Sequence, residues 1–275
     1  MGEAFALSAA LCFGVTHFVC GVLAKRSDGV TVALYGQISG TIASVPLLWL
    51  GSSSPGALGW GALSGLGTAA GIGCLYLAMG RGAVSIAAPA SDLGAAVLPV
   101  LVGIVFLAER PAVFALVGMV AALPAIYLVS RGKETGASDL SSLGLALLAG
   151  VGLGTHFVAI GAIGPHDGFA PIVVSRLVSV LPLAFLAAVR SKLTMPAKPM
   201  VGAAAAGVVG TLATVLYFVA TRSELVATAA VLSALYPAIP VVLALVFLRE
   251  RISRRQVAGL LCAGAAIGLI AASGN

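Results

Sequence analysis

The sequence predicts an all-α membrane protein in which ten transmembrane helices form two inverted five-helix repeats around a central cavity. Composition is the first of three supporting observations: of 275 residues, 60% are hydrophobic and 9% are charged, and the mean hydropathy is +1.13. A soluble domain carries roughly 25% charged residues, so this chain could not cover its surface with polar groups. The other two observations are a series of long apolar runs and a repeat that relates the two halves.

The apolar runs have the length that a membrane helix needs, because about 20 residues cross ~30 Å of hydrocarbon. Ten such runs are present, at 3–24, 29–50, 57–79, 84–107, 112–130, 140–163, 168–190, 199–220, 226–248 and 255–272. The first lacks a basic leader and a small-residue cleavage site, so we expect a retained helix. All four cysteines fall inside these runs without metal-ligand spacing, and we therefore expect neither a disulfide nor a metal site.

A repeated segment divides the chain into halves. The stretches Gly80–Arg110 and Thr221–Arg251 correspond at a shift of 141 residues, and each holds a long apolar run, a central proline and a terminal Glu-Arg pair. A second match, the sequence Thr-His-Phe-Val, recurs at a shift of 139. We predict a first repeat at 1–130, a linker at 131–139 and a second repeat at 140–275.

The repeats must be inverted, because a half with five helices delivers the chain to the opposite side of the membrane. This architecture is typical of secondary transporters, whose substrate site lies near the membrane midplane. Loops after odd-numbered helices carry twelve Lys and Arg residues, whereas loops after even-numbered helices carry two, Arg110 and Arg222. The bias predicts a multi-pass protein of the cell (inner) membrane with both termini outside. Confined to short turns, these charges do not indicate a nucleic-acid partner.

Short motifs at the helix ends show a family resemblance. They are Ser233–Pro237 followed by Phe247–Arg251, and their first-half counterparts Pro99 and Phe106–Arg110. In these motifs the chain resembles the drug/metabolite transporter superfamily, specifically a ten-helix protein with two EamA-type domains. The resemblance implies a secondary transporter, often an exporter of amino acids, metabolites or drugs, without a cofactor.

The resemblance also implies a cavity lined mainly by helices 1, 3, 4, 6, 8 and 9. The chain departs from the family pattern in helix 1, where members commonly have a tryptophan before the glycine and this chain has Cys12-Phe13-Gly14. Many ten-helix members keep their termini in the cytoplasm, whereas the charges here argue the reverse. The related small multidrug pumps use a membrane-embedded glutamate in their first helix. No glutamate lies deep in helix 1 or 6 here, so that proton-coupling scheme is not carried over.

Two strongly charged residues lie well inside the apolar runs, Asp92 and Arg176. Buried charges in a membrane are costly and usually face the bundle interior or a wet cavity. At 1.5 Å per residue, Asp92 lies roughly 5 Å to the cytoplasmic side of the midplane and Arg176 about as far to the outer side. They could neutralise each other or bond to neighbouring backbone, or each could line the cavity. An inward-facing Arg176 favours an amino acid or another carboxylate, and Asp92 alone favours a cation.

The remaining candidates for substrate binding are polar but uncharged. His17 and His156 occupy equivalent places in the repeats and can donate and accept hydrogen bonds, although a packing role is the alternative. Tyr76 and Tyr217 also correspond, and near helix ends they could equally be interfacial anchors. Tyr236 directly precedes Pro237, and Ser233 lies one helical turn earlier. The proline leaves backbone carbonyls at mid-depth without their helical donors.

We therefore expect a secondary active transporter that exports small metabolites such as amino acids or amphipathic compounds by alternating access. The alternatives are a multidrug or organic-cation exporter that uses Asp92 and, less favoured, a channel. Motifs of a membrane enzyme, such as HExxH, an acidic pair or a phosphate loop, are missing, which predicts no catalytic residues. The expected partners are a small-molecule substrate, with proton coupling left open, and membrane lipids. The expected state is a monomer or weak dimer.

Overall fold

The structure is a computed structural model that describes residues 1–24, 26–80, 84–130, 140–190, 193–247 and 253–272. Within these ranges the chain is almost entirely helical and forms no strand. Eight segments are long and apolar enough to cross a membrane, and two shorter apolar helices, Ala90–Val105 and Val113–Val129, bring the number to ten. The predicted fold class is confirmed.

The first half contains five helices and one short 3₁₀ segment. Their bounds are α1 Gly2–Ala24, α2 Gly29–Ser44, η1 Val45–Trp49, α3 Pro55–Gly80, α4 Val84–Val105 and α5 Val113–Ser130. The second predicted helix ends six residues early because Pro46 cannot donate to the α-helical ladder, and the chain tightens into η1.

The second half contains six helices, one more than predicted. They are α6 Leu140–Gly161, α7 Ala170–Val189, α8 Ala197–Ala220, α9 Val226–Ser233, α10 Ala238–Phe247 and α11 Arg254–Ala271. The ninth run, expected as one bent helix, is two helices joined by a turn at residues 234–237. Pro237 and Pro240 explain the break, since neither can donate a backbone hydrogen bond to the preceding turn.

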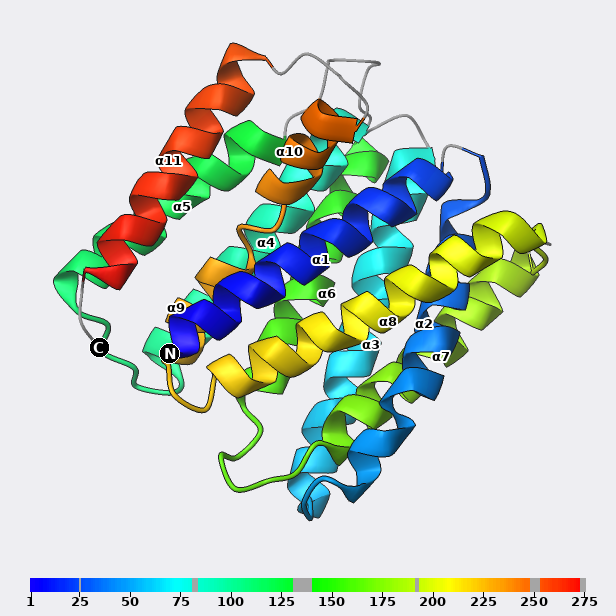
Figure 1. Cartoon of the computed structure of the whole chain (residues 1–275), viewed down its shortest axis with the longest axis horizontal. Helices are drawn as coiled ribbons and strands as arrows, with labels where there is room; N and C mark the ends of the chain where they lie inside the picture. Colours follow the sequence, from blue (N-terminus) through cyan, green and yellow to red (C-terminus); the bar gives the residue numbers. More distant parts are fainter. Residues whose placement is uncertain (25, 81–83, 131–139, 191–192, 248–252, 273–275) are drawn as a thin grey trace.

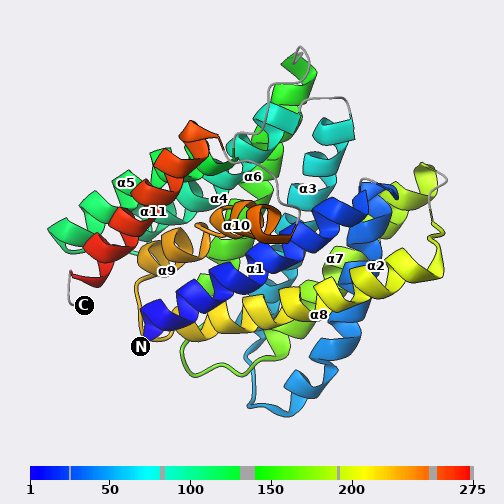
Figure 2. The same cartoon turned by 45° about the horizontal axis from the view of Figure 1, so that its top comes forward.

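The halves interlock rather than lie side by side. In Figure 1, α1 lies along α8, and α6 passes behind it next to α3 and α4. The packing repeats under exchange of the halves: α1 packs on α8 and α9, as α6 packs on α3 and α4. Figure 2 shows α5 and α11 as a pair on one side of the bundle. Large apolar side chains such as Phe114, Leu181, Phe185 and Leu261 are mostly exposed on the outside, as contact with lipid requires.

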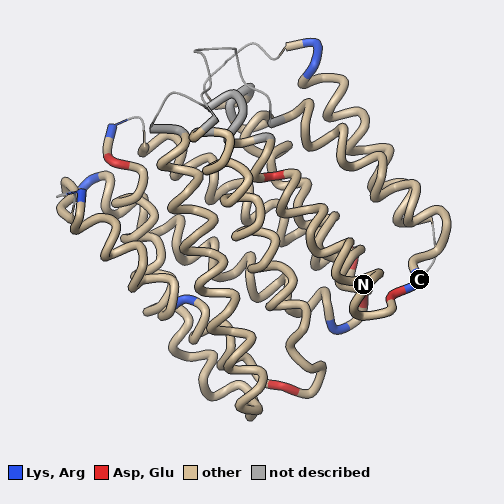
Figure 3. The backbone as a smooth tube through the Cα atoms, turned by 180° about the vertical axis from the view of Figure 1, so that it is seen from behind, with Lys and Arg blue, Asp and Glu red and all other residues tan. Residues whose placement is uncertain are grey.

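The bundle has two faces with different charge. We call the face at which α1, α3, α5, α7 and α10 end the basic face, and the face at which α1 begins and α11 ends the terminal face (Figure 1). Figure 3 shows the described Lys and Arg mostly near the basic face. The predicted linker 131–139, Arg81 and the Arg249–Arg251 pair with Glu250 lie outside the described residues.

Candidate functional site

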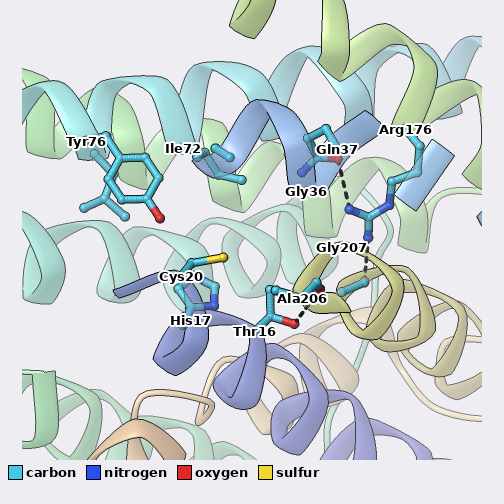
Figure 4. A pocket seen from close by; sticks show the side chains of 13 residues that line it. Thr16, His17, Cys20, Gly36, Gln37, Ile72, Tyr76, Arg176, Ala206 and Gly207 are labelled. Carbon is cyan, nitrogen blue, oxygen red and sulfur yellow. Dashed lines mark hydrogen bonds between the residues drawn. The ribbon is translucent and has the colours of Figure 1, made fainter. Parts of the chain in front are cut away.

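A cavity lies between the halves at mid-depth and extends toward the basic face. It consists of two adjoining chambers of about 70 Å³ and about 80 Å³. The residues that line both chambers are Thr16, His17, Gln37, Ile72, Arg176 and Gly210. Figure 4 shows Arg176 at one end of the first chamber and Tyr76 at the other, with Cys20 and His17 between them. The lining is mostly apolar, with few polar groups.

Arg176 on α7 is the charged group of the cavity. Only 7% of its surface is exposed. Its guanidinium donates to Gln37 Oε1 at 3.0 Å, to the Gly210 carbonyl and to Thr214 Oγ1 at 2.6 Å. All three acceptors are neutral, and its Nε has no hydrogen-bond partner. Among the described residues, Arg176 forms no ion pair, so its charge is held by dipoles alone.

His156 on α6 anchors a buried group of hydroxyls next to Arg176. Its Nδ1 lies 2.8 Å from Ser64 Oγ and 3.0 Å from Thr68 Oγ1. Ser64 Oγ is also 2.8 Å from Ser175 Oγ on α7. Hydrogen bonds thus link α3, α6 and α7 behind the second chamber, and they fix the histidine ring where it lines the cavity.

Tyr236 forms the wall opposite, in the turn between α9 and α10. Its ring stacks on His17, with centroids 4.5 Å apart and an interplanar angle of 23°. Its hydroxyl donates to Asp92 Oδ1 on α4. Gly14 on α1 permits this approach, because a Cβ there would lie 2.4 Å from Ile239 Cβ and 2.8 Å from the Tyr236 carbonyl oxygen. The helix break therefore brings a phenol to the centre of the bundle.

Five of the eight candidate residues line the cavity: His17, Tyr76, His156, Arg176 and Tyr236. Asp92 lies behind Tyr236, outside the lining set, and does not pair with Arg176. Tyr217 is fully buried and donates to the Phe157 carbonyl, whereas Ser233 donates to the Ala6 carbonyl. These last two side chains hold helices together in this structure.

The cavity includes helices that the resemblance did not imply. Gln37 on α2 and Arg176 on α7 line it, while α4 contributes only from behind Tyr236. Gln37, Thr68 and Thr214 were not among the candidate residues named from the sequence. A threonine within an apolar helix is a weak indicator of a binding site. Its hydroxyl can bond to a carbonyl one turn earlier in the same helix, as Thr68 and Thr214 also do here.

On the side of the terminal face the bundle is closed. Glu109, in the loop after α4, accepts from the backbone amides of Val226 at 2.6 Å and Ala227 at 3.0 Å, and so caps α9 of the other half. A carboxylate at a helix N-terminus is stabilised by unpaired amides and the helix dipole. Beneath this contact, Phe157, Tyr217 and Phe218 belong to a buried core.

A second contact on the terminal face involves Asp167 in the loop after α6. The Ser54 amide donates to Asp167 Oδ1 at 2.7 Å, and this hydrogen bond holds the pKa of the exposed carboxyl below its ordinary value. Arg222 donates to the Asp167 carbonyl and lies over the rings of Phe169 and Phe218. Loops from both halves are thus joined at this face.

An inverted-repeat helical bundle with a cavity between its halves is the architecture of a membrane transporter. The EamA-like transporter family matches residues 1–131 and again residues 140–272. The chain belongs to this family and is a membrane transporter of small molecules.

Comparison with solved structures shows the fold independently, with 28 matching chains. One crystal structure of a protein aligns with a TM-score of 0.73 at 15% identity, covering 98% of this chain and 95% of that one. A comparison with curated proteins gives no significant match. The described residues contain no group of three or more His, Cys, Asp or Glu placed to bind a metal ion.

Proposed function

We propose that the protein is a secondary transporter that exports small carboxylate-bearing metabolites, such as amino acids, by alternating access. The observation that supports this most strongly is the position of Arg176. A guanidinium in a membrane interior is costly when no opposite charge accompanies it. Here the cavity wall supplies only neutral acceptors, and the Arg176 Nε remains unbonded. A substrate carboxylate provides the missing charge and a further acceptor.

The rest of the cavity lining suits the part of the substrate that lies beyond its carboxylate. Phe13, Ile72, Leu153 and Phe157 offer apolar contact, and the ring of Tyr76 closes the far end. Ligand sites typically combine an apolar surface with a few placed polar groups that fix orientation. His17 and His156 are the groups suited to hydrogen-bond a second polar substituent. The chambers are small, which favours metabolites over bulky drugs.

The closure of one face favours export. The charge bias predicts that the basic face, toward which the cavity extends, is cytoplasmic. The Glu109 cap and the buried core close the terminal face. In this arrangement the site is loaded from the cytoplasm, and rocking of the halves would open it outward. The same closure disfavours a channel, which needs a continuous path.

The organic-cation alternative depends on Asp92, and its geometry disfavours direct contact with a substrate. Tyr236 stands between Asp92 and the cavity, and its hydroxyl already donates to the carboxylate. A cation in the cavity would meet the uncompensated charge of Arg176 before it reached Asp92. Like charges in a low-dielectric site repel, so a cation is the less favourable occupant.

A thermal-stability screen of the purified protein tests the substrate class. L-Alanine, L-leucine and L-phenylalanine are compared with their carboxamides and with tetraethylammonium. A ligand at about 100 times its Kd stabilises the native state by about 2.7 kcal/mol. We expect at least one free carboxylate to raise the melting temperature, its amide to fail, and Arg176→Gln to abolish the rise. Arg190→Gln, outside the cavity, is the matched control. Stabilisation by tetraethylammonium alone would support the cation alternative instead.

A further inference from the structure

The hydrogen bond between Asp92 and Tyr236 joins the two halves at the centre of the bundle. Asp92 lies on α4, and Tyr236 lies in the break between α9 and α10, which correspond to α4 in the repeat. Asp92 and Tyr236 are only 6% and 4% exposed. Of the acidic residues that the structure describes, Asp92 alone is buried. A carboxylate at this depth needs a role that outweighs its cost.

Tyr236 connects this carboxylate to the substrate cavity. One face of its ring lies against His17, which lines both chambers, while its hydroxyl donates away from the cavity to Asp92 Oδ1. A phenolic oxygen can donate one hydrogen and also accept. The direction in which the Tyr236 hydroxyl hydrogen points therefore depends on whether Asp92 is ionised or protonated.

We propose that Asp92 is a proton-binding site and that Tyr236 couples its occupancy to the substrate cavity. This inference rests on the proposed transport function. With Asp92 ionised, Tyr236 donates to it. When a water-borne proton forms an O–H bond to Asp92, the carboxylic acid becomes the donor and Tyr236 the acceptor. The Tyr236 hydrogen is then free to turn toward the cavity. Loss of the proton to water breaks the O–H bond formed on uptake and reverses both changes.

Among the residues that the structure describes, few other titratable groups share this environment. The helices packed on α4 are α3, α5, α6 and α9, and α9 contains none. The titratable side chains of the others, together with the residue stacked on Tyr236 and the cation across the cavity, are Cys74, Tyr76, Tyr127, His156, His17 and Arg176. None of these is a carboxylic acid, so within the described part of the chain Asp92 is the carboxylate available for a proton at this depth.

The asymmetry of the repeat gives one such site per molecule. At the 141-residue shift, Asp92 corresponds to Ser233, and Tyr236 corresponds to Ala95. The symmetry-related pair of positions, Ser233 and Ala95, therefore has neither a carboxylate nor a phenol. Movement of the α9–α10 turn relative to α4 must lengthen or re-form the bond as the halves rock. This arrangement predicts the exchange of one proton for one substrate.

Infrared difference spectroscopy of the full chain in lipid tests proton binding without any substrate. We expect a carboxylic-acid C=O band to appear as the pH is lowered from mildly alkaline to mildly acidic. The band should disappear in Asp92→Asn and persist at a changed frequency in Tyr236→Phe, which retains the acid. Asp167→Asn and Tyr35→Phe, both outside the cavity, should leave it unchanged. If no titrating band depends on Asp92, the proposal is overturned.

Transport of radiolabelled L-leucine in proteoliposomes tests coupling. One pH unit corresponds to about tenfold accumulation for one proton. We expect the wild type to accumulate L-leucine under a pH gradient, and Asp92→Asn to exchange it without accumulation. Exchange by the wild type with no accumulation would refute coupling and leave the transport function standing. Absence of all exchange of L-leucine and of the other screened carboxylates would refute the transport function, and the infrared result would still decide whether Asp92 binds a proton.

Discussion

At the scale of single residues, the site depends on a few polar side chains whose surroundings determine what they can do. Arg176 and Asp92 are both buried charges, but Arg176 faces the cavity with neutral neighbours and Asp92 is screened by Tyr236. Sequence reasoning singled out both residues, because a charge within an apolar run is conspicuous. It could not choose between pairing and separate roles, since that depends on the positions of α4 and α7. The partners Gln37 and Thr214 emerged only from the packing.

A surface acid illustrates how one residue fixes a helix end. Asp28 caps α2 and accepts from the Thr31 amide at 3.1 Å and from Arg190 at 3.2 Å. Partial burial opposes ionisation, but these hydrogen bonds and the nearby guanidinium outweigh it and lower the pKa below its ordinary 3.8. Asp28→Ala should lower the free energy of unfolding by about 1 kcal/mol at neutral pH, whereas Asp28→Asn, which keeps a hydrogen-bond acceptor, should lower it less.

The pH dependence of the stability lost in Asp28→Ala follows from the direction of the Asp28 pKa shift. A carboxyl whose pKa is lowered in the folded state stabilises the protein above its unfolded pKa, and the contribution is lost as the pH falls through the folded value. Thermal unfolding in detergent should show the largest gap between wild type and Asp28→Ala at neutral pH. The gap should shrink in acid, below the ordinary pKa of 3.8. A gap that widened on acidification would contradict the capping role.

At the scale of elements, glycine determines which helices can approach. GxxxG spacings on α2, α3 and α6 lie at tight helix contacts, whereas a Cβ at Gly264 or Gly268, a GxxxG pair on α11, would meet nothing within 4 Å. The spacing alone therefore does not identify a contact. The ninth run shows a similar limit, because its two prolines predicted a bend within one helix, whereas the structure has two separate helices there.

Two alanine substitutions distinguish tight from open glycine positions. A Cβ at Gly207 on α8 would lie 2.0 Å from the Gly36 carbonyl oxygen, so Gly207→Ala must push α2 and α8 apart. Overpacking of this kind typically costs about 1–3 kcal/mol. Gly144→Ala, where nothing lies within 4 Å, should instead stabilise the helix by about 0.5–1 kcal/mol. Unfolding measurements in detergent should give changes in stability of opposite sign for the two variants relative to wild type. Equal changes would refute the close contact between α2 and α8.

At the scale of the whole molecule, two inverted halves create a cavity that is closed on one face. The ten-helix class and the repeat followed from the sequence, because hydrophobic length and a constant residue shift are local signals. The inclusion of α2 and α7 in the cavity did not, since it depends on how the halves interlock. The closure by Glu109 was equally inaccessible, because its partners, Val226 and Ala227, lie 117 and 118 residues away.

The native Cys20 reports on membrane orientation. It lies on α1 near the basic face and lines the cavity. In a variant that keeps only this cysteine, a membrane-impermeant maleimide should label inside-out vesicles and spare right-side-out vesicles. The reason is that the charge bias predicts a cytoplasmic basic face. Labelling only of right-side-out vesicles would overturn the predicted topology.

The most direct test of the central claim is counterflow in proteoliposomes. An alternating-access carrier exchanges substrate faster when the opposite side is loaded, because its loaded halves rock without an empty return step. Vesicles filled with an unlabelled carboxylate identified by the stability screen should take up the labelled compound faster than empty vesicles. Arg176→Gln should lose this stimulation, and Arg190→Gln should keep it. Uptake that is insensitive to the internal carboxylate, or unchanged in Arg176→Gln, would contradict a carrier that binds carboxylates at Arg176.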